Sequence, residues 1–119
     1  MSGIEMFRCD AARAERYPAG RTVFVEGEPG ETMYVVIEGE VELRVKGQTV
    51  ERLGPGGMLG EMSLVDAAPR SATAVAGTEA KLVPVDRRRF ASMIRTRPSF
   101  AIEIMRVMAD RLRRMDARL

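Results

Sequence analysis

Residues 33–46 read Met-Tyr-Val-Val-Ile-Glu-Gly-Glu-Val-Glu-Leu-Arg-Val-Lys, and apolar side chains alternate with other residues along most of this stretch. A period of two places successive side chains on opposite faces of a strand. The stretch therefore predicts one long half-buried strand or two strands interrupted at Gly39. Lys46-Gly47-Gln48 then predicts a hairpin turn, after which the chain returns through Val50 and Leu53.

The sequence on either side of this hairpin predicts further short strands. Val23 and Val25 are two residues apart within residues 21–26, and two more β candidates lie at residues 71–76 and 80–85. Turns rich in glycine and proline separate these segments. Short strands at this spacing predict a mainly β fold, which is a small β-sandwich, jelly roll or barrel.

Helices are predicted at both ends of the chain. Residues 3–16 form a weakly amphipathic pattern, which predicts a short helix that ends before Tyr17. From Asp86 the period changes to about 3.6. Asp86 is a good N-cap for a helix over 87–96, and Pro98 suits the first position of a second helix that runs to near the chain end. The inner face of the first of these two helices would carry Phe90, Met93 and Ile94.

The apolar residues of the last helix have the spacing of a coiled-coil seam. The seam consists of Ala101, Met105, Met108, Leu112, Met115 and Leu119, and Ile104 and Val107 widen it. Such a seam can fold back over a pocket of its own chain or pair with a second copy. The pattern therefore predicts either a lid or a homodimer through residues 99–119.

Composition excludes several classes of protein. A chain of 119 residues is long enough for one domain, so we expect a single domain over residues 1–119. The chain has no His and one Cys, Cys9, which excludes Ser-His-Asp and Cys-His catalysis, a zinc finger and an internal disulfide. No apolar run approaches a membrane span, and the first residues lack a signal peptide pattern. We therefore expect a cytoplasmic protein that is not an enzyme, has no catalytic residues and no metal site, and does not bind membranes.

Charge is distributed unevenly along the chain. Residues 1–86 carry 9 Lys and Arg against 14 Asp and Glu, whereas residues 87–119 carry 10 against 3. A basic C-terminal segment can contact a membrane surface or bind nucleic acid weakly and without sequence specificity, or it can lie on the acidic body of its own chain.

The most distinctive chemistry lies in residues 60–73, Gly-Glu-Met-Ser-Leu-Val-Asp-Ala-Ala-Pro-Arg-Ser-Ala-Thr. Arg70 is an isolated cation followed by a hydroxyl, and the planar fork of its guanidinium suits a phosphate. A carboxylate such as that of Glu61, which begins a predicted helical turn, can accept hydrogen bonds from sugar hydroxyls. The segment therefore predicts a site for a phosphorylated sugar or a nucleotide. The alternative is that Arg70 pairs with Glu61 or Asp66 on the surface.

The order of these segments resembles the cyclic nucleotide-binding domain family, which includes sensor domains of catabolite-activator-type regulators, cyclic-nucleotide-dependent kinases and gated channels. The matching segments are Glu26-Gly27-Glu28-Pro29-Gly30, residues 33–39, Leu53-Gly54-Pro55-Gly56, residues 60–64 and Pro69-Arg70-Ser71-Ala72-Thr73. The resemblance covers roughly residues 17–119. It implies a β-roll of the jelly-roll or double-stranded β-helix type at 17–86 with a phosphate-binding cassette at 60–73, and two C-terminal helices at 87–119. The N-terminal helix predicted from the residue pattern would occupy 1–16.

The resemblance also implies roles for individual residues. Glu61 would accept a hydrogen bond from the ribose 2′-OH, Arg70 would pair with the cyclic phosphate, and Ser71 would add donors to it. Arg111 matches a position that pairs with the cassette glutamate in the activator type, here Glu61; the alternative is a solvent-facing Arg111. The candidate ligand-binding residues are Gly60, Glu61, Met62, Ser63, Arg70, Ser71, Ala72 and Arg111.

Recognition of the base is not assigned to the last helix, because Met115 and Asp116 stand where the activator type has a Thr-Ser pair that reads adenine. Ser71 is compatible with cAMP and with cGMP, and the likeness to bacterial cassettes favours cAMP. We therefore expect a cyclic nucleotide sensor, without a cofactor, that repositions its last helix when the ligand binds. The alternative is a degenerate sensor domain that acts through protein contacts without nucleotide.

Relations to other macromolecules are the last expectations from the sequence. The effector protein or domain is not identified. Since the chain ends at Leu119, after the long helix, we expect no helix-turn-helix domain and no sequence-specific DNA binding.

Overall fold

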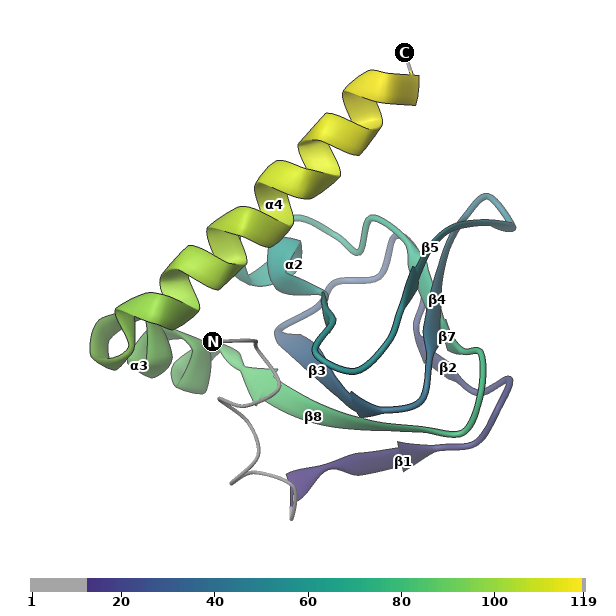
Figure 1. The fold of residues 1–119 in the computed structure, drawn as a ribbon, viewed down its shortest axis with the longest axis horizontal. Coiled ribbons are helices and arrows are strands. Elements are labelled where there is room, and N and C mark those ends of the chain that lie inside the picture. The colour runs from purple at the N-terminus through teal and green to yellow at the C-terminus, as the bar shows by residue number, and fades with distance from the viewer. Residues whose placement is uncertain (1–12, 119) are drawn as a thin grey trace.

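The computed structural model describes residues 13–118, with side chains described for residues 13–114. In this part of the chain there are eight strands and three helices (Figure 1). The strands are β1 (Glu15–Tyr17), β2 (Thr22–Phe24), β3 (Thr32–Glu38), β4 (Val41–Val45), β5 (Gln48–Leu53), β6 (Met58–Leu59), β7 (Thr73–Ala76) and β8 (Ala80–Asp86). The helices are α2 (Glu61–Asp66), α3 (Arg87–Thr96) and α4 (Pro98–Arg118).

The strands form two antiparallel sheets. One sheet has the order β1-β8-β3-β6 and the other has the order β2-β7-β4-β5. The long helix α4 runs along one side of the strands, with α3 beneath its first turns and α2 between α4 and the sheets (Figure 1). This arrangement confirms the predicted mainly β roll with flanking helices.

Gly39 marks the point where the chain leaves one sheet for the other. The long alternation predicted from residue 33 is therefore two strands, β3 and β4, interrupted at Gly39. Gly39 has φ +83°, and a Cβ atom there would collide with the carbonyl oxygen of Glu79 and lie 2.8 Å from the Cα of Ala80. Only glycine meets both requirements at low energy.

A substitution at Gly39 is therefore expected to destabilise the fold more than the same substitution at Gly47. Gly47 also has a positive φ, +80°, but nothing lies within 4 Å of a Cβ atom built there. Gly47→Ala should lower the free energy of unfolding by about 1 kcal/mol, and Gly39→Ala by about 3 kcal/mol or more. Urea denaturation of the two variants measures both values. Equal losses would contradict the close approach of the two backbones at Gly39.

Two apolar clusters cover the two faces of the sheet that contains β3 and β8. The cluster between the sheets includes Tyr17, Phe24, Val36, Val41, Leu59, Ala74 and Leu82. The cluster between this sheet and the helices includes Met33, Val35, Leu64, Val83, Met93, Phe100 and Ile104. Val35 and Val36 are both fully buried, so the expectation of a half-buried strand is wrong for β3. The reason is that the second sheet covers the face of Val36, which the alternation left open, while helices cover the face of Val35.

Two expectations for the first strands need correction. In β2 the buried side chain is Phe24, whereas Val25 is exposed, so the predicted inward phase of Val23 and Val25 is wrong. The pairing of β2 with β7 is irregular between Thr22 and Phe24, which shifts the phase. Residues 1–12 of the predicted N-terminal helix lie outside the described residues. Its expected end is wrong, because Glu15 and Arg16 belong to β1 and pair with β8.

The predicted starts of both C-terminal helices are confirmed. The side chain of Asp86 caps α3 by accepting a hydrogen bond from the backbone N–H of Arg89 at 2.8 Å, and Pro98 begins α4. Arg97 separates the two helices with a non-helical backbone. The rings of Phe90 and Phe100 then meet edge to face at 5.7 Å between centroids and hold the first turn of α4 on the core.

The predicted inner faces of these helices are only partly correct. Met93 is buried, but Ile94 is 36% exposed and does not belong to the inner face of α3. In α4, Phe100 and Ile104 are buried, whereas the seam residues Met105 and Leu112 are 61% and 60% exposed. Met105 and Leu112 therefore do not cover the β-roll, whereas the seam residue Met108 packs beside Phe100 and Ile104 on the core. The seam's last two side chains, Met115 and Leu119, lie outside the described residues.

Candidate functional site

A pocket of about 740 Å³ lies between the β4–β5 hairpin, the segment around α2 and the helix α4. Pockets of about 300–1,000 Å³ commonly hold small ligands. Of the eight predicted ligand-binding residues, those that line the pocket are Gly60, Met62, Ser63, Arg70, Ser71, Ala72 and Arg111. The eighth, Glu61, lies behind this lining and is fully buried.

Arg70 is a buried cation at the wall of this pocket, with 6% of its surface exposed. Its Nη2 donates to the carbonyl oxygen of Thr32 at 2.7 Å, and its Nη1 donates to that of Gly60 at 3.3 Å. The guanidinium also lies over the ring of Phe24, 4.2 Å from the centroid. Burial lowers the pKa of Arg70, which reflects the cost of removing a charge from water.

No carboxylate balances this charge at close range. Among residues 13–114, no carboxylate oxygen lies within 4 Å of the Arg70 guanidinium, and its buried Nε has no hydrogen-bond partner there. The alternative in which Arg70 pairs with Glu61 or Asp66 on the surface is therefore wrong. A buried guanidinium held by neutral groups at the wall of a pocket suits an anion.

Two glycines, which have no Cβ atom, make room for the guanidinium of Arg70. A Cβ atom on Gly30 would collide with Nε and Cζ of Arg70, and a Cβ atom on Gly60 would lie 2.6 Å from its Nη1. Gly60 also has φ +82° and caps the N-terminus of α2. Sequence reasoning assigned Gly60 to the site but treated Gly30 as a turn residue only.

Gly30→Ala is therefore expected to move the Arg70 guanidinium without unfolding the domain, since the end of a flexible side chain can shift. A charge-assisted hydrogen bond to an anion depends on this position, so affinity for a phosphate ligand should fall by about tenfold. Titration calorimetry with cAMP measures the change. Gly54→Ala is the matched control, because nothing lies within 4 Å of a Cβ atom there. Equal affinities of the two variants would contradict this role of Gly30.

The predicted pair between Arg111 and Glu61 is present. Nη1 of Arg111 forms an ion pair with Oε1 of Glu61, and Nη2 donates to the carbonyl oxygen of Met58 at 2.8 Å. Oε2 of Glu61 is buried and has no hydrogen-bond partner among the residues with described side chains. The alternative of a solvent-facing Arg111 is wrong. Burial lowers the pKa of Arg111, and Glu51 opposes that shift.

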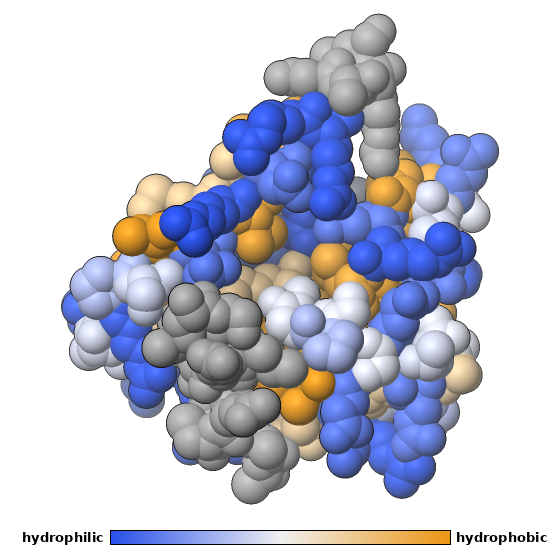
Figure 2. All heavy atoms as spheres, in the orientation of Figure 1, coloured by the Kyte–Doolittle hydropathy of each residue, from blue (hydrophilic) through white to orange (hydrophobic). Residues whose placement is uncertain are grey.

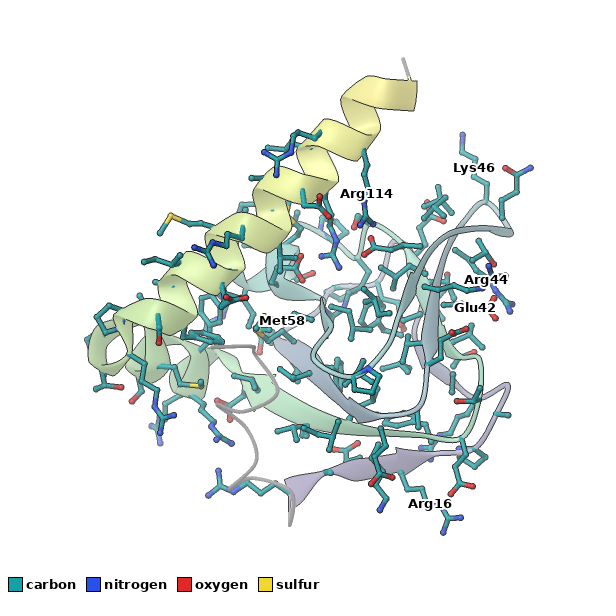
Figure 3. The ribbon with its side chains drawn as sticks, in the orientation of Figure 1. Arg16, Glu42, Arg44, Lys46, Met58 and Arg114 are labelled. Carbon is teal, nitrogen blue, oxygen red and sulfur yellow. The ribbon has the colours of Figure 1, made fainter. Side chains whose placement is uncertain are left out.

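Glu51 of β5 extends this network to the next turn of α4. Nε of Arg111 lies 3.4 Å from Oε1 of Glu51, and Nη1 of Arg114 lies 3.2 Å from Oε2. Arg114 also pairs with Asp110 at 2.9 Å. Figure 3 shows Arg114 reaching from α4 towards the strands. Glu51 and Arg114 both line the pocket, so the helix and the hairpin meet over it through charged groups.

Comparison with known proteins agrees with this geometry. Residues 14–97 match the family model described as a cyclic nucleotide-binding domain. The chain belongs to this family. The resemblance found in its sequence is therefore confirmed, and so is the prediction of a cyclic nucleotide-binding regulatory module.

Two relatives of this cyclic nucleotide-binding domain have names that describe bacterial cAMP-responsive proteins. It is 38% identical over 108 residues to the CRP-like cAMP-activated global transcriptional regulator of Mycobacterium tuberculosis, covering 87% of this chain and 48% of the relative. It is 39% identical over 108 residues to the cyclic AMP receptor protein of Thermus thermophilus, covering 87% and 50%. The chain spans about half the length of these curated relatives.

A solved structure has the same fold. The catabolite activator protein of Thermus thermophilus superimposes with a TM-score of 0.79 at 36% identity, covering 96% of this chain and 57% of that one. The likeness extends over nearly all of the cyclic nucleotide-binding domain, including its helices.

Sequence reasoning missed Glu51, Arg114, Phe24 and Gly30 in this cyclic nucleotide-binding domain. For Glu51 the sequence did contain a signal. Side chains two residues apart lie on the same face of a strand, so Glu51 shares the inward face of Leu53. Glu51 indeed lies opposite Leu43, whose side chain is buried. No comparable signal marked Arg114, which sequence analysis treated as part of a basic segment.

A further arginine ties the cassette to the C-terminal helices. Nη1 and Nη2 of Arg87, the first residue of α3, donate to the carbonyl oxygens of Leu64 and Ser63 at 3.2 and 3.4 Å. These carbonyls belong to the last turn of α2, which needs donors at that end. The cassette helix is therefore attached to both α3 and α4.

Neither a metal-binding cluster nor a membrane-spanning helix lies in the described part of the domain. Within residues 13–118, no set of three or more His, Cys, Asp and Glu side chains could hold a metal ion. None of the helices in the same range combines the length and apolar character needed to cross a membrane.

Proposed function

We propose that this cyclic nucleotide-binding domain is a sensor for cAMP and that cAMP repositions α4. The single observation that carries the proposal is the buried guanidinium of Arg70 at the wall of the pocket, within 4 Å of which no carboxylate oxygen of residues 13–114 lies. One cyclic phosphate has one negative charge, which this guanidinium would balance. The preference for cAMP is supported by the relatives whose names include cAMP.

The proposed roles are those that the resemblance implies, and the residues concerned line the pocket except for the buried Glu61. The cyclic phosphate pairs with Arg70 and accepts from the hydroxyl or backbone of Ser71, with the backbone of Gly60 and Ala72 beside it. The ribose 2′-OH donates to Glu61. Met62 and Ser63 complete the wall between phosphate and ribose.

Repositioning of α4 would follow because Arg111 of α4 and the ribose of the ligand use the same carboxylate, that of Glu61. Arg111 pairs with Glu61, the same carboxylate that the ribose would use. A ligand that changes this pairing changes the relative energies of the positions of α4. NMR spectra of α4 with and without cAMP test this step, and identical spectra would refute it.

The experiment that tests the function is calorimetric titration of refolded, ligand-free protein with cAMP and then with cGMP. We expect saturable binding of cAMP with weaker binding of cGMP. Tighter binding of cGMP would reverse the proposed base preference. No binding of either nucleotide would overturn the function and favour the alternative, a degenerate sensor domain that acts through protein contacts.

Other expectations from the sequence stay predictions. They are the absence of catalysis and of a cofactor, a cytoplasmic location, and the absence of membrane binding and of sequence-specific DNA binding by these residues. A homodimer through residues 99–119 also stays a prediction. It is supported by the exposed apolar side chains of Ile102, Met105 and Leu112 on α4, the helix along which apolar surface appears between charged groups in Figure 2.

A further inference from the structure

We propose that Glu51 reads the base of the bound nucleotide by accepting a hydrogen bond from the exocyclic amino group of adenine. This inference rests on the proposed function, because it requires a cyclic nucleotide in the pocket. It assigns recognition of the base to β5, whereas the sequence analysis did not assign this role to the last helix.

Glu51 is a carboxylate on the inward face of a strand. In the β4–β5 ladder it lies opposite Leu43, which is buried, and both residues line the pocket. Its side chain is only 15% exposed. An inward carboxylate beside apolar side chains is unfavourable unless it has polar partners. This position therefore needs an explanation beyond packing.

The two guanidinium groups beside Glu51 fix its orientation without using its full capacity. Oε1 is contacted by Arg111 and Oε2 by Arg114, whose guanidinium is held in turn by Asp110. An ionised carboxylate has about four lone-pair sites. The two contacts therefore leave it able to accept a further N–H from a ligand.

The path of the chain places Glu51 on the side of the pocket where the base would lie. Arg70 binds the carbonyl oxygen of Gly60, and Arg111 binds that of Met58. Glu51 contacts Arg111 and is not within 4 Å of Arg70. A nucleotide with its phosphate at Arg70 and its ribose at Glu61 would thus direct its base towards Arg111 and Glu51.

The chemistry of Glu51 defines what it can read. An ionised carboxylate only accepts hydrogen bonds, so it needs an N–H donor on the base. Adenine offers its 6-amino group and guanine its 2-amino group, whereas the base faces can pack against Val45 and Val50 of the hairpin. Since the proposed ligand is cAMP, the donor is the 6-amino group.

A thermodynamic cycle between protein and ligand tests this contact. The affinities of the wild type and of Glu51→Met are measured by calorimetry for cAMP and for purine riboside 3′,5′-cyclic monophosphate, which lacks the 6-amino group. The wild type should prefer cAMP by about tenfold, as expected for a hydrogen bond to a charged acceptor. Glu51→Met should bind the two ligands equally. Because a cycle isolates the pair, a general loss of stability cancels.

Arg106→Met is the matched control. It removes an arginine of α4 that pairs with Glu103 and does not line the pocket, so the tenfold preference for cAMP should persist. If Glu51→Met does not fold, Glu51→Gln replaces it; because a neutral amide oxygen is a weaker acceptor, the preference should fall to about threefold or less.

Three outcomes overturn the inference. If the variant at Glu51 keeps the wild-type preference, Glu51 has a structural role only. A second cycle compares cGMP with inosine 3′,5′-cyclic monophosphate, which lacks the 2-amino group of guanine. If the variant at Glu51 loses the preference for cGMP in this second cycle but shows no change in the first, the assignment to adenine is overturned. If the wild type binds neither cAMP nor cGMP, the proposed function itself is overturned, and the inference with it.

Discussion

Arg70→Ala should lower the affinity for cAMP by about 30-fold or more, since a desolvated charge pair contributes roughly 2–5 kcal/mol. Arg70 is 6% exposed and is held by two carbonyl oxygens, so its guanidinium is already ordered where the phosphate would bind. Alanine would remove the charge and leave both carbonyl oxygens without this donor. Titration calorimetry of the variant with cAMP measures the loss.

Arg44→Ala is the control for this experiment. Arg44 belongs to β4, as the pocket residue Leu43 does, but its side chain pairs with Glu42 at the surface and does not line the pocket. Its replacement should leave the affinity unchanged. Thermal unfolding of both variants separates a loss of binding from a loss of fold. An Arg70→Ala variant that is folded and binds cAMP as tightly as the wild type would refute the site.

The second large effect is expected for Arg111→Ala. Glu61 is fully buried, and its described ionic partner is Arg111. Removing one partner of a buried pair leaves an uncompensated charge, which typically destabilises a protein by about 3–5 kcal/mol. We expect a loss of about 3 kcal/mol in the free energy of unfolding, measured by urea denaturation without ligand.

Two further variants sharpen this prediction. Arg106→Ala removes another arginine from α4 whose pair with Glu103 is exposed, so it should change stability by less than about 0.5 kcal/mol. Replacing both partners, Glu61→Leu with Arg111→Met, should recover most of the stability, because the buried charge of Glu61 is removed together with its partner and Glu51 keeps its pair with Arg114. If Arg111→Ala were no less stable than Arg106→Ala, the pair would not contribute to the fold.

Local pattern was sufficient to predict much of the fold. The alternation around Gly39, the N-cap at Asp86 and the proline at residue 98 each identified an element or its boundary. The pairing of distant segments was not visible in the same way. Glu15 and Arg16 are strand residues because β8 pairs with them, and Val36 is buried because the second sheet covers it.

The residues of the site also fall into those that a local motif predicted and those that depend on distant segments. Glu61 and Arg70 lie in one short motif, so the sequence predicted both. Glu51 and Gly30 act through partners far along the chain: Glu51 and Arg111 are 60 residues apart. Their importance follows from how the hairpin and α4 meet over the pocket, which no local window contains. Leucine and methionine at heptad positions predicted a seam, but the stripe that packs on the core was decided by Phe100 and Ile104.

Because Arg87 attaches α3 to α2, a small displacement of α2 can tilt the base of α4, and the tilt produces a larger displacement at the far end of α4. α2 and the start of α3 are joined by two hydrogen bonds, α3 ends at the non-helical Arg97, and Phe100 holds the first turn of α4 on the core. α4 is 21 residues long. At 1.5 Å per residue, a helix of that length is a lever arm of about 31 Å, so a tilt of about 10° at its base moves its tip by about 5 Å. A rearrangement too small to disturb the β-roll would therefore be large where α4 ends.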